Sequence, residues 1–207
     1  MDSPFSAREY MNRSTQEEYA LLIIDMQNDF VLPESPVRVE GALETIPAIR
    51  VLLDGFRERR WPVFHIVREY RFDGSDVEII RLEEFRKRPF AVYGSSGYEI
   101  VEALEPLPGE YRIVKSRFSA FMKTELDFIL RRLGIARLVV CGTQYPTCVR
   151  ATIFDAVSYG YWVINITDAS SAKSEEIAVS NIRDIRDTGV ECMNLETFFR
   201  RVHDESL

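Results

Sequence analysis

Cysteine and histidine are scarce in this sequence. Its 207 residues contain three cysteines, Cys141, Cys148 and Cys192, and so odd and small a set argues against a disulfide framework and predicts free thiols. The two histidines, His65 and His203, lie far apart in the chain and cannot by themselves supply a histidine-rich metal centre. We therefore predict neither a bound metal nor another cofactor.

Basic residues are also fewer than acidic residues. The chain has 26 lysines and arginines against 33 aspartates and glutamates, a formal net charge of -7, and the two signs are interspersed. A nucleic acid or an anionic membrane needs a basic face, so we exclude both as partners. No apolar run approaches the length that spans a bilayer, and the N-terminal segment lacks the apolar core of a signal peptide. These absences predict a soluble, cytoplasmic protein.

The sequence does have a regular alternation of two patterns. Six aliphatic runs predict strands buried on both faces, as in a parallel sheet; they are Ala20–Ile24, Val63–Val67, Tyr111–Val114, Leu138–Cys141, Trp162–Ile166 and Val190–Met193. Segments of helical period lie between them, namely Ile46–Arg59, Glu99–Leu104, Thr124–Leu133, Cys148–Tyr159 and Ile177–Asp187. The stretch from Glu69 to Ser96 is irregular, and its length predicts an excursion over one end of the sheet.

This alternation predicts an α/β fold, a three-layer α/β/α sandwich with a six-stranded, mostly parallel, Rossmann-like sheet. The length suits one domain, which we place at residues 19–207 after an N-terminal extension at residues 1–18. Gly134, Gly160 and Gly189 each follow a predicted helix, at the place where a helix C-cap is expected. The predicted helix ends and strand starts therefore agree with one another.

Three reactive side chains follow predicted strands. Asp25 comes directly after Ala20–Ile24, Lys115 directly after Tyr111–Val114, and Cys148 after the loop that leaves Leu138–Cys141. The carboxyl ends of parallel strands meet at one edge of a sheet, where ligands bind near a switch in strand order. Strand direction alone thus predicts an acid, a cation and a thiol at the same edge.

These residue types suit acyl transfer. A thiol at a helix N-terminus near an ammonium group is favoured as the nucleophilic thiolate, Asp25 could take its proton and return it to a leaving amine, and backbone N–H groups before Cys148 could stabilise an oxyanion. Each residue also has a structural interpretation: Asp25 as a turn former, Lys115 as a solvated strand end and Cys148 as a small buried hydrophobe. It is their conjunction that favours chemistry.

The residues around these positions resemble one known family, the isochorismatase-like cysteine hydrolases. Three motifs carry the resemblance, in the family's order, over most of the chain from about Tyr19 to Phe199: Leu22–Phe30, which reads LIIDMQNDF; Lys115–Phe121, which reads KSRFSAF; and Gly142–Thr152, which reads GTQYPTCVRAT. The resemblance implies the same three-layer fold and a catalytic triad of Asp25, Lys115 and Cys148.

The resemblance also implies details of the nucleophile loop and of assembly. A non-proline cis peptide would join Thr143 to Gln144, and the backbone N–H groups of Gln144 and Cys148 would form the oxyanion hole. Family members usually form dimers or larger assemblies, so a homodimer or higher homo-oligomer is expected, with a small molecule as the substrate.

Departures from neighbouring subfamilies narrow the function. Relatives that cleave the vinyl ether of isochorismate generally lack the cysteine, so Cys148 indicates covalent amide chemistry. Nicotinamidases bind a metal through an Asp-x-His pair after the second strand, and Val67–Arg71 here reads VREYR, without those ligands. The segment His65–Ser75 is similar to a subgroup acting on urea-like or ureido substrates. A catalytically silent binding protein and a nicotinamidase with unusual metal ligands remain the alternatives.

Substrate contacts are predicted less sharply. The tentative set comprises Phe30, Arg68, Phe121 and Tyr145, because the aromatic rings could form an apolar wall and Arg68 or Arg71 could bind a substrate carboxylate or carbonyl. Either arginine could equally pair with Glu69 or Asp73 on the surface, and the rings could belong to the core. We interpret His65 as a hydrogen-bonded core residue, His203 as exposed, and Cys141 and Cys192 as packing residues.

Overall fold

A computed structural model describes residues 19–204 of the chain, in which six strands form one sheet. The strands are β1 (Tyr19–Ile24), β2 (Val63–Arg68), β3 (Tyr111–Lys115), β4 (Arg137–Thr143), β5 (Trp162–Ser171) and β6 (Glu191–Met193). Their order is β3-β2-β1-β4-β5-β6, and every neighbouring pair is parallel. The chain winds outward from β1 in both directions, so a switch in strand order lies between β1 and β4.

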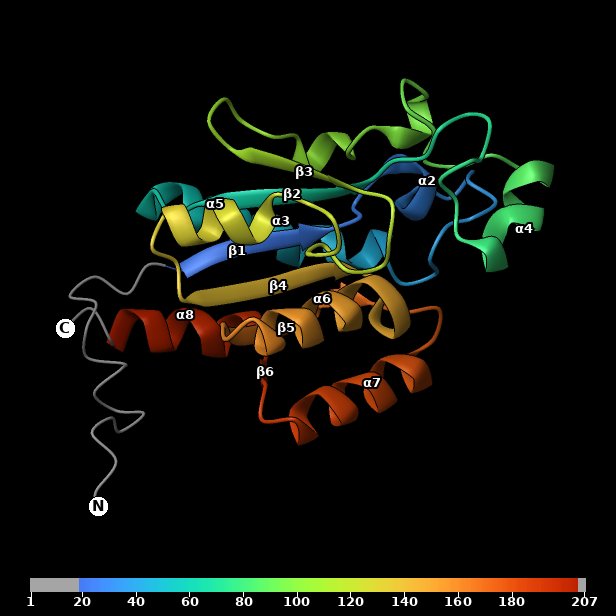
Figure 1. Cartoon of the computed structure of the whole chain (residues 1–207). Coiled ribbons are helices and arrows are strands. Elements are labelled where there is room, and N and C mark those ends of the chain that lie inside the picture. The colour runs from blue at the N-terminus through green and yellow to red at the C-terminus, as the bar shows by residue number, and fades with distance from the viewer. Residues whose placement is uncertain (1–18, 205–207) are drawn as a thin grey trace, which may run out of the picture.

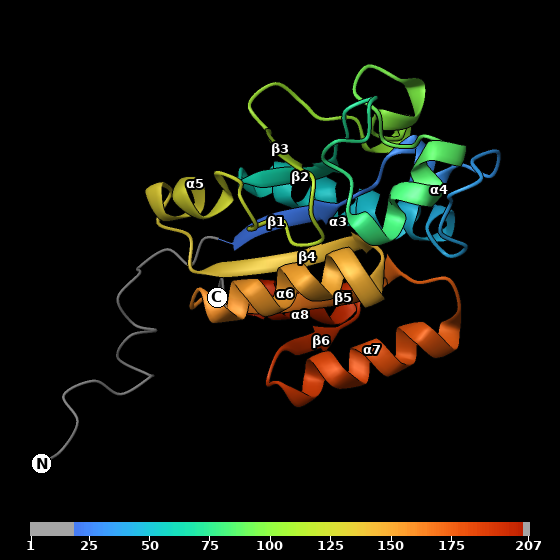
Figure 2. The same ribbon diagram turned by 45° about the vertical axis from the view of Figure 1, so that its right-hand side comes forward.

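Helices cover both faces of the sheet (Figures 1 and 2). One face packs against α5 (Leu126–Arg132), α6 (Arg150–Ser158) and α7 (Glu175–Asp187), and the other against α3 (Ile46–Arg59) and α8 (Leu195–Asp204). Alternate residues of the central strand divide between the two cores: Leu22 packs on the α5–α6–α7 side and Leu21 on the α3–α8 side. This burial of both faces explains the continuous apolar runs in the sequence.

The predicted fold class is confirmed, and so are all six predicted strands, with ends shifted by up to five residues. Helix α3 has the predicted bounds. The glycines predicted to follow helices do so in the left-handed region, with φ of 72° at Gly134, 89° at Gly160 and 90° at Gly189. A residue with a Cβ is disfavoured there, which is why glycine ends these helices.

The predicted helix Glu99–Leu104 is wrong. Only Glu102–Leu104 is helical, as a single 3-10 turn, while Ile100 forms an isolated bridge with Gln27. Six residues followed by two nearby prolines are too short a segment to nucleate a helix. The sequence also gave no prediction for α8 or for α4 (Leu82–Lys87).

The irregular stretch lies over the carboxyl end of the sheet, as predicted (Figure 1). It carries α4 and packs against the short helix α2 (Asn28–Val31) through a small separate core. That core contains Phe30, Tyr70, Val77, Phe85, Phe90 and Ala91. The segment therefore covers the carboxyl ends of the strands.

The predicted N-terminal extension, residues 1–18, lies outside the described residues. Within residues 19–204, none of the helices is long and apolar enough to cross a membrane. The compartment of the protein stays a prediction.

Candidate active site

Four strands deliver one polar residue each to the carboxyl edge of the sheet. Lys115 ends β3, Arg68 ends β2, Asp25 directly follows β1, and Cys148 follows β4 after a short loop. All four side chains are buried. Because the strands lie in the order β3-β2-β1-β4, Arg68 stands between Lys115 and Asp25 in the row.

Lys115 and Asp25 form a buried ion pair. The Lys115 Nζ atom lies 2.8 Å from Asp25 Oδ2. Asp25 has a positive φ of 51°, a conformation that costs a non-glycine residue about 1 kcal/mol but that aspartate tolerates better than most residues. Its backbone N–H donates to the carbonyl oxygen of Ile66, so β2 fixes the turn that aims the carboxylate.

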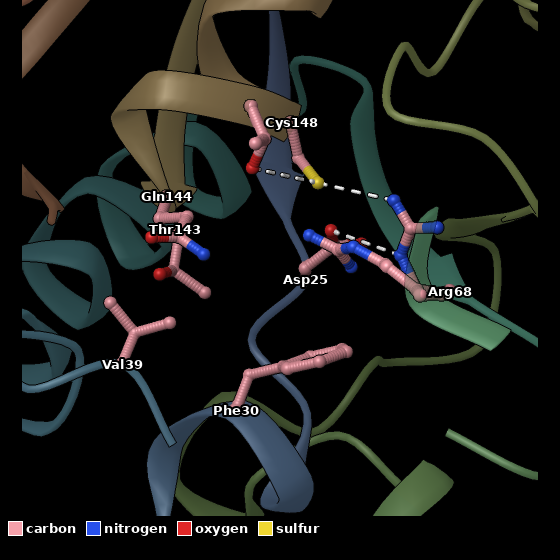
Figure 3. A pocket seen from close by; sticks show the side chains of 9 residues that line it. Asp25, Phe30, Val39, Arg68, Thr143, Gln144 and Cys148 are labelled. Carbon is pink, nitrogen blue, oxygen red and sulfur yellow. Dashed lines mark hydrogen bonds and ion pairs between the residues drawn. The ribbon is translucent and has the colours of Figure 1, made fainter. Parts of the chain in front are cut away.

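Arg68 contacts the sulfur of Cys148. Its Nη2 atom donates to Cys148 Sγ at 3.2 Å, and its Nε atom lies 4.0 Å from Asp25 Oδ2 (Figure 3). On the opposite side its Nη1 atom donates to Glu78 Oε1 at 2.8 Å and to the Tyr70 hydroxyl, which in turn donates to Glu78. The guanidinium is therefore held between an acidic anchor and the thiol.

The charge of Arg68 is maintained despite its burial. Burial lowers the pKa of Arg68, but the neighbouring Cys148, Asp25, Tyr70 and Glu78 outweigh it and raise the pKa well above the ordinary value. Burial raises the pKa of Glu78 as well, yet Arg68 and the Tyr70 hydroxyl lower it on balance. The pair is a guanidinium facing a carboxylate.

The amide of Gln27 fixes the backbone at Arg68. Gln27 Oε1 accepts from the Arg68 N–H at 2.7 Å, and Gln27 Nε2 donates to the Arg68 carbonyl at 2.8 Å and to the Tyr98 carbonyl at 2.7 Å. The side chain is fully buried, and a satisfied buried amide of this kind specifies one arrangement of the strand end.

The loop before Cys148 depends on a glycine. Gly142 pairs with Ile24 of β1, and a Cβ at Gly142 would come within 2.3 Å of the Ile24 carbonyl oxygen. The peptide bond between Thr143 and Gln144 is cis. This is the bond that the family resemblance predicts to be cis. A π-helical turn, Tyr145–Val149, then carries Cys148 and leads directly into α6.

Asp25, Arg68 and Cys148 line a small cavity that opens to the surface (Figure 3). Its wall consists of Asp25, Phe30, Val39, Arg68, Arg81, Thr143, Gln144, Thr147 and Cys148. The cavity volume is about 20 Å³, enough for a water molecule or a carbonyl group. Three buried atoms of the wall, Asp25 Oδ1, Arg68 Nε and Thr143 Oγ1, have no hydrogen-bond partner among residues 19–204. Such unpaired buried atoms are costly and indicate a polar ligand.

The predicted reactive residues are thus brought together. Asp25 and Cys148 line the cavity, and Lys115 supports Asp25 from outside its wall. Gln144 and Cys148, whose backbone N–H groups would form the predicted oxyanion hole, both line the cavity. Their chemical roles stay predictions.

The tentative substrate contacts divide into two groups. Phe30 and Arg68 line the cavity, whereas Phe121 and Tyr145 do not. Phe121 is buried in the core and stacks on the exposed Tyr159, and the Tyr145 hydroxyl donates to Asn165 Oδ1. Their positions favour packing over substrate contact, because apolar burial competes for the same aromatic residues.

Arg71 lies on the surface, where its side chain is 71% exposed and its Nε is 3.6 Å from Asp73 Oδ1. Of the two arginines considered from the sequence, only Arg68 reaches the cavity. Both are in the predicted segment, but Arg68 is the last residue of β2 and points into the crevice, while Arg71 follows in the turn.

The remaining predicted residues lie away from the cavity. His65 is buried, and its Nε2 atom is 2.8 Å from Glu110 Oε2, which matches a hydrogen-bonded core residue. His203 is exposed. Cys141 is fully buried, which raises its pKa, and Cys192 is partly buried, which raises its pKa as well. Among residues 19–204 no group of three or more His, Cys, Asp or Glu could hold a metal ion.

Sequence reasoning missed several residues of the site, among them Val39 and Thr147 of the cavity wall. Glu78, Tyr70 and Gln27 hold Arg68, and Arg81 completes the cavity wall. Gln27 belongs to the motif Leu22–Phe30, and its place in that motif could have indicated a role at the site. Glu78 and Arg81 belong to the irregular excursion, where no periodicity predicts which way a side chain points.

Comparisons with known proteins show the family and the fold of this chain. A family model described as the isochorismatase domain matches residues 19–197. A probable inactive nicotinamidase of Arabidopsis thaliana is 38% identical over 180 residues, 85% of this chain and 92% of that protein. The ureidoacrylate amidohydrolase RutB of Pantoea ananatis is 28% identical over 204 residues, 89% of this chain and 78% of that protein. The crystal structure of an isochorismatase family protein from Desulfovibrio vulgaris covers 91% of this chain and 100% of its own, with 48% identity and a TM-score of 0.88.

Proposed function

This chain belongs to the isochorismatase family, and we propose that it hydrolyses a carbon–nitrogen bond of a small amide or ureido compound with Cys148 as the nucleophile. The observation that carries the proposal is the pairing of Lys115 Nζ with Asp25 Oδ2 at 2.8 Å, beside a cavity that Asp25 and Cys148 share. The Pantoea relative is named for hydrolysis of ureidoacrylate, a compound with a ureido group and a carboxylate.

In the first half of the reaction, Asp25 takes the proton of the Cys148 thiol and the thiolate attacks the substrate carbonyl carbon. The backbone N–H groups of Gln144 and Cys148 stabilise the negative oxygen of the tetrahedral intermediate. The carbon–nitrogen bond then breaks, Asp25 returns its proton to the leaving nitrogen, and ammonia or an amine departs from a Cys148 thioester.

In the second half, water replaces the departed amine. Asp25 takes a proton from that water, which attacks the thioester carbon, and the carbon–sulfur bond breaks. The sulfur leaves as a thiolate and recovers its proton from Asp25, which restores the starting state. Lys115 holds the Asp25 carboxylate in place throughout.

Two other functions are alternatives to this amide hydrolysis. The Arabidopsis relative is described as a probable inactive nicotinamidase, so a chain that binds a small molecule without turnover is one. A nicotinamidase is the other, and ammonia release from nicotinamide, with and without added divalent zinc, iron or manganese and a chelator, distinguishes it. A homodimer or larger homo-oligomer is proposed from the family resemblance, and light scattering of the purified chain tests it.

The experiment that tests the proposed function measures ammonia release from a panel of small amides and ureido compounds. The wild type is compared with Cys148→Ala and with the matched control Cys141→Ala, which removes a thiol from the core. Activity that disappears in Cys148→Ala and persists in folded Cys141→Ala supports the proposal. Equal losses in the two variants, or no mass increase on Cys148 when the enzyme is quenched during turnover, contradict it.

A further inference from the structure

We infer that the substrate carries a carboxylate and that Arg81 is its receptor. The inference rests on the proposed function, because it names the substrate class of the same cavity. Arg81 is the last residue of a 3-10 turn, Ile79–Arg81, and its side chain lines the cavity together with Asp25, Arg68 and Cys148.

The side chain of Arg81 has no acidic partner among residues 19–204. Its guanidinium carbon lies 4.9 Å from the centroid of the Phe118 ring, and no carboxylate of these residues comes within ion-pair distance. A guanidinium that stacks on an aromatic face keeps its N–H groups at the edge free to donate. Arg81 is therefore preorganised to form two parallel hydrogen bonds with a carboxylate.

The charged side chains at the cavity include one more positive charge than negative charges. Asp25 and Cys148 share one proton during the proposed reaction, so together they carry one negative charge whichever of them holds it. Lys115 balances that charge, at 2.8 Å from Asp25, and Glu78 balances Arg68, also at 2.8 Å. Arg81 remains unbalanced, in a chain whose formal net charge is -7. An anionic substrate completes the balance.

The orientation of the turn supports the same conclusion. Ile79 and Ile80 are 90% and 82% exposed, while the charged Arg81 is partly buried at the cavity. Apolar side chains usually lie in the core and charged ones in solvent, so this turn has the opposite arrangement. Reversals of this kind are expected at functional sites, where packing is not what selects the residue.

The small cavity fits one end of such a substrate. Its volume of about 20 Å³ accommodates the carbonyl that Cys148 attacks, and Arg81 belongs to the same wall, so the rest of the molecule can extend along that wall to the guanidinium. A short substrate with the carboxylate a few bonds from the carbonyl suits this geometry.

The test uses two matched pairs of probes that differ only in the carboxylate: ureidoacetate against ureidoacetamide, and β-ureidopropionate against its amide. Each probe is titrated by calorimetry into the full chain carrying Cys148→Ala, in which no turnover occurs. The same titrations are repeated after adding Arg81→Gln or, as the control, Arg86→Gln. Arg86 is an exposed residue of α4, so its loss removes a positive charge from the same region without touching the cavity.

We expect at least one carboxylate to bind about tenfold or more tightly than its amide. Arg81→Gln should abolish that preference and leave amide binding unchanged, while Arg86→Gln should preserve it. Equal binding of acid and amide, a preference that survives Arg81→Gln, or no binding of either carboxylate overturns the inference.

Ammonia release from the same four probes by the Cys148 enzyme separates this inference from the proposed function. A carboxylate preference without turnover contradicts the proposed function and leaves Arg81 as the receptor. Turnover of the amides at the same rate as the acids supports the proposed function and contradicts the inference.

Discussion

Arg68 and Cys148 are joined by a buried contact of 3.2 Å between a guanidinium nitrogen and the thiol sulfur. The contact joins the end of β2 to the turn after β4, and these two strands lie on either side of β1, which Asp25 follows. A guanidinium this close donates a charge-assisted hydrogen bond to the sulfur, which fixes the direction in which the Cys148 side chain points. We therefore expect Arg68 to be a positioning residue for the proposed nucleophile.

Replacing Arg68 with glutamine should impair both the thiol and the fold. The variant leaves the partly buried Glu78 with only the Tyr70 hydroxyl as a partner, which costs about 1 to 3 kcal/mol of unfolding free energy. Alkylation of Cys148 at neutral pH should slow about tenfold or more, because the guanidinium no longer donates to the sulfur. Urea unfolding and iodoacetamide labelling with peptide mapping measure the two effects. The double variant Arg68→Gln, Glu78→Gln should regain stability but not labelling; recovery of both would show that Arg68 acts only on the fold.

Replacing Lys115 with methionine should reduce turnover by about a hundredfold or more, because Asp25 loses the hydrogen-bond donor that holds its carboxylate in place. Lys87 provides the matched control, since it pairs with Glu83 on the surface at 2.7 Å and an exposed pair contributes at most about 1 kcal/mol. Steady-state ammonia release compares Lys115→Met with Lys87→Met. Similar rates in the two variants would count against a role for Lys115.

His65 should make the protein less stable in mild acid. Burial lowers the pKa of His65 below its ordinary value of 6.5, despite the opposing effect of Glu110. The unfolded chain therefore binds a proton more readily than the folded one, so the stability present above pH 6.5 is lost as the pH falls.

Urea unfolding between neutral pH and about pH 5 checks this prediction. His65→Gln should flatten the pH dependence, while His203→Gln, at an exposed position, should not change it. A wild-type slope that persists in His65→Gln would assign the effect to other groups.

Replacing Gly142 with alanine should be severe. The added Cβ would lie 2.3 Å from the Ile24 carbonyl oxygen, at a φ of 109°, so β1 and β4 would have to separate at the switch point. We expect a loss of more than about 3 kcal/mol. Gly134→Ala is the control: it meets nothing within 4 Å, so only the strain of its positive φ remains, about 1 to 2 kcal/mol. Equal urea midpoints for the two variants would contradict the argument.

Much of the fold could be predicted because its signals are local. A strand buried on both faces requires a continuous aliphatic run, as in Leu21–Ile24, and a helix end in the left-handed region requires a residue such as Gly160. The prediction of a helix at Glu99–Leu104 was wrong because the apolar residues there have helical spacing, but Ile100 forms a β-bridge with Gln27 instead. Periodicity does not report such a long-range competitor.

The site could be predicted only in part, for the same reason. Asp25, Lys115 and Cys148 follow strands, and the direction of parallel strands brings strand ends together without knowledge of any side-chain contact. Glu78 and Arg81 come from the excursion, and whether their side chains point toward the crevice or toward water depends on how that segment packs on Phe30 and Tyr70.

The sequence by itself determined the layered α/β architecture and the edge of the sheet at which the reactive acid, cation and thiol meet, because hydrophobic periodicity and strand direction are properties of the chain. Only the tertiary structure decided that Arg68 binds the thiol while Arg71 faces solvent, that Phe121 and Tyr145 belong to the core, and that Arg81 lines the cavity. Those outcomes depend on distances between segments far apart in the sequence, where burial and charge pairing select one orientation for each side chain.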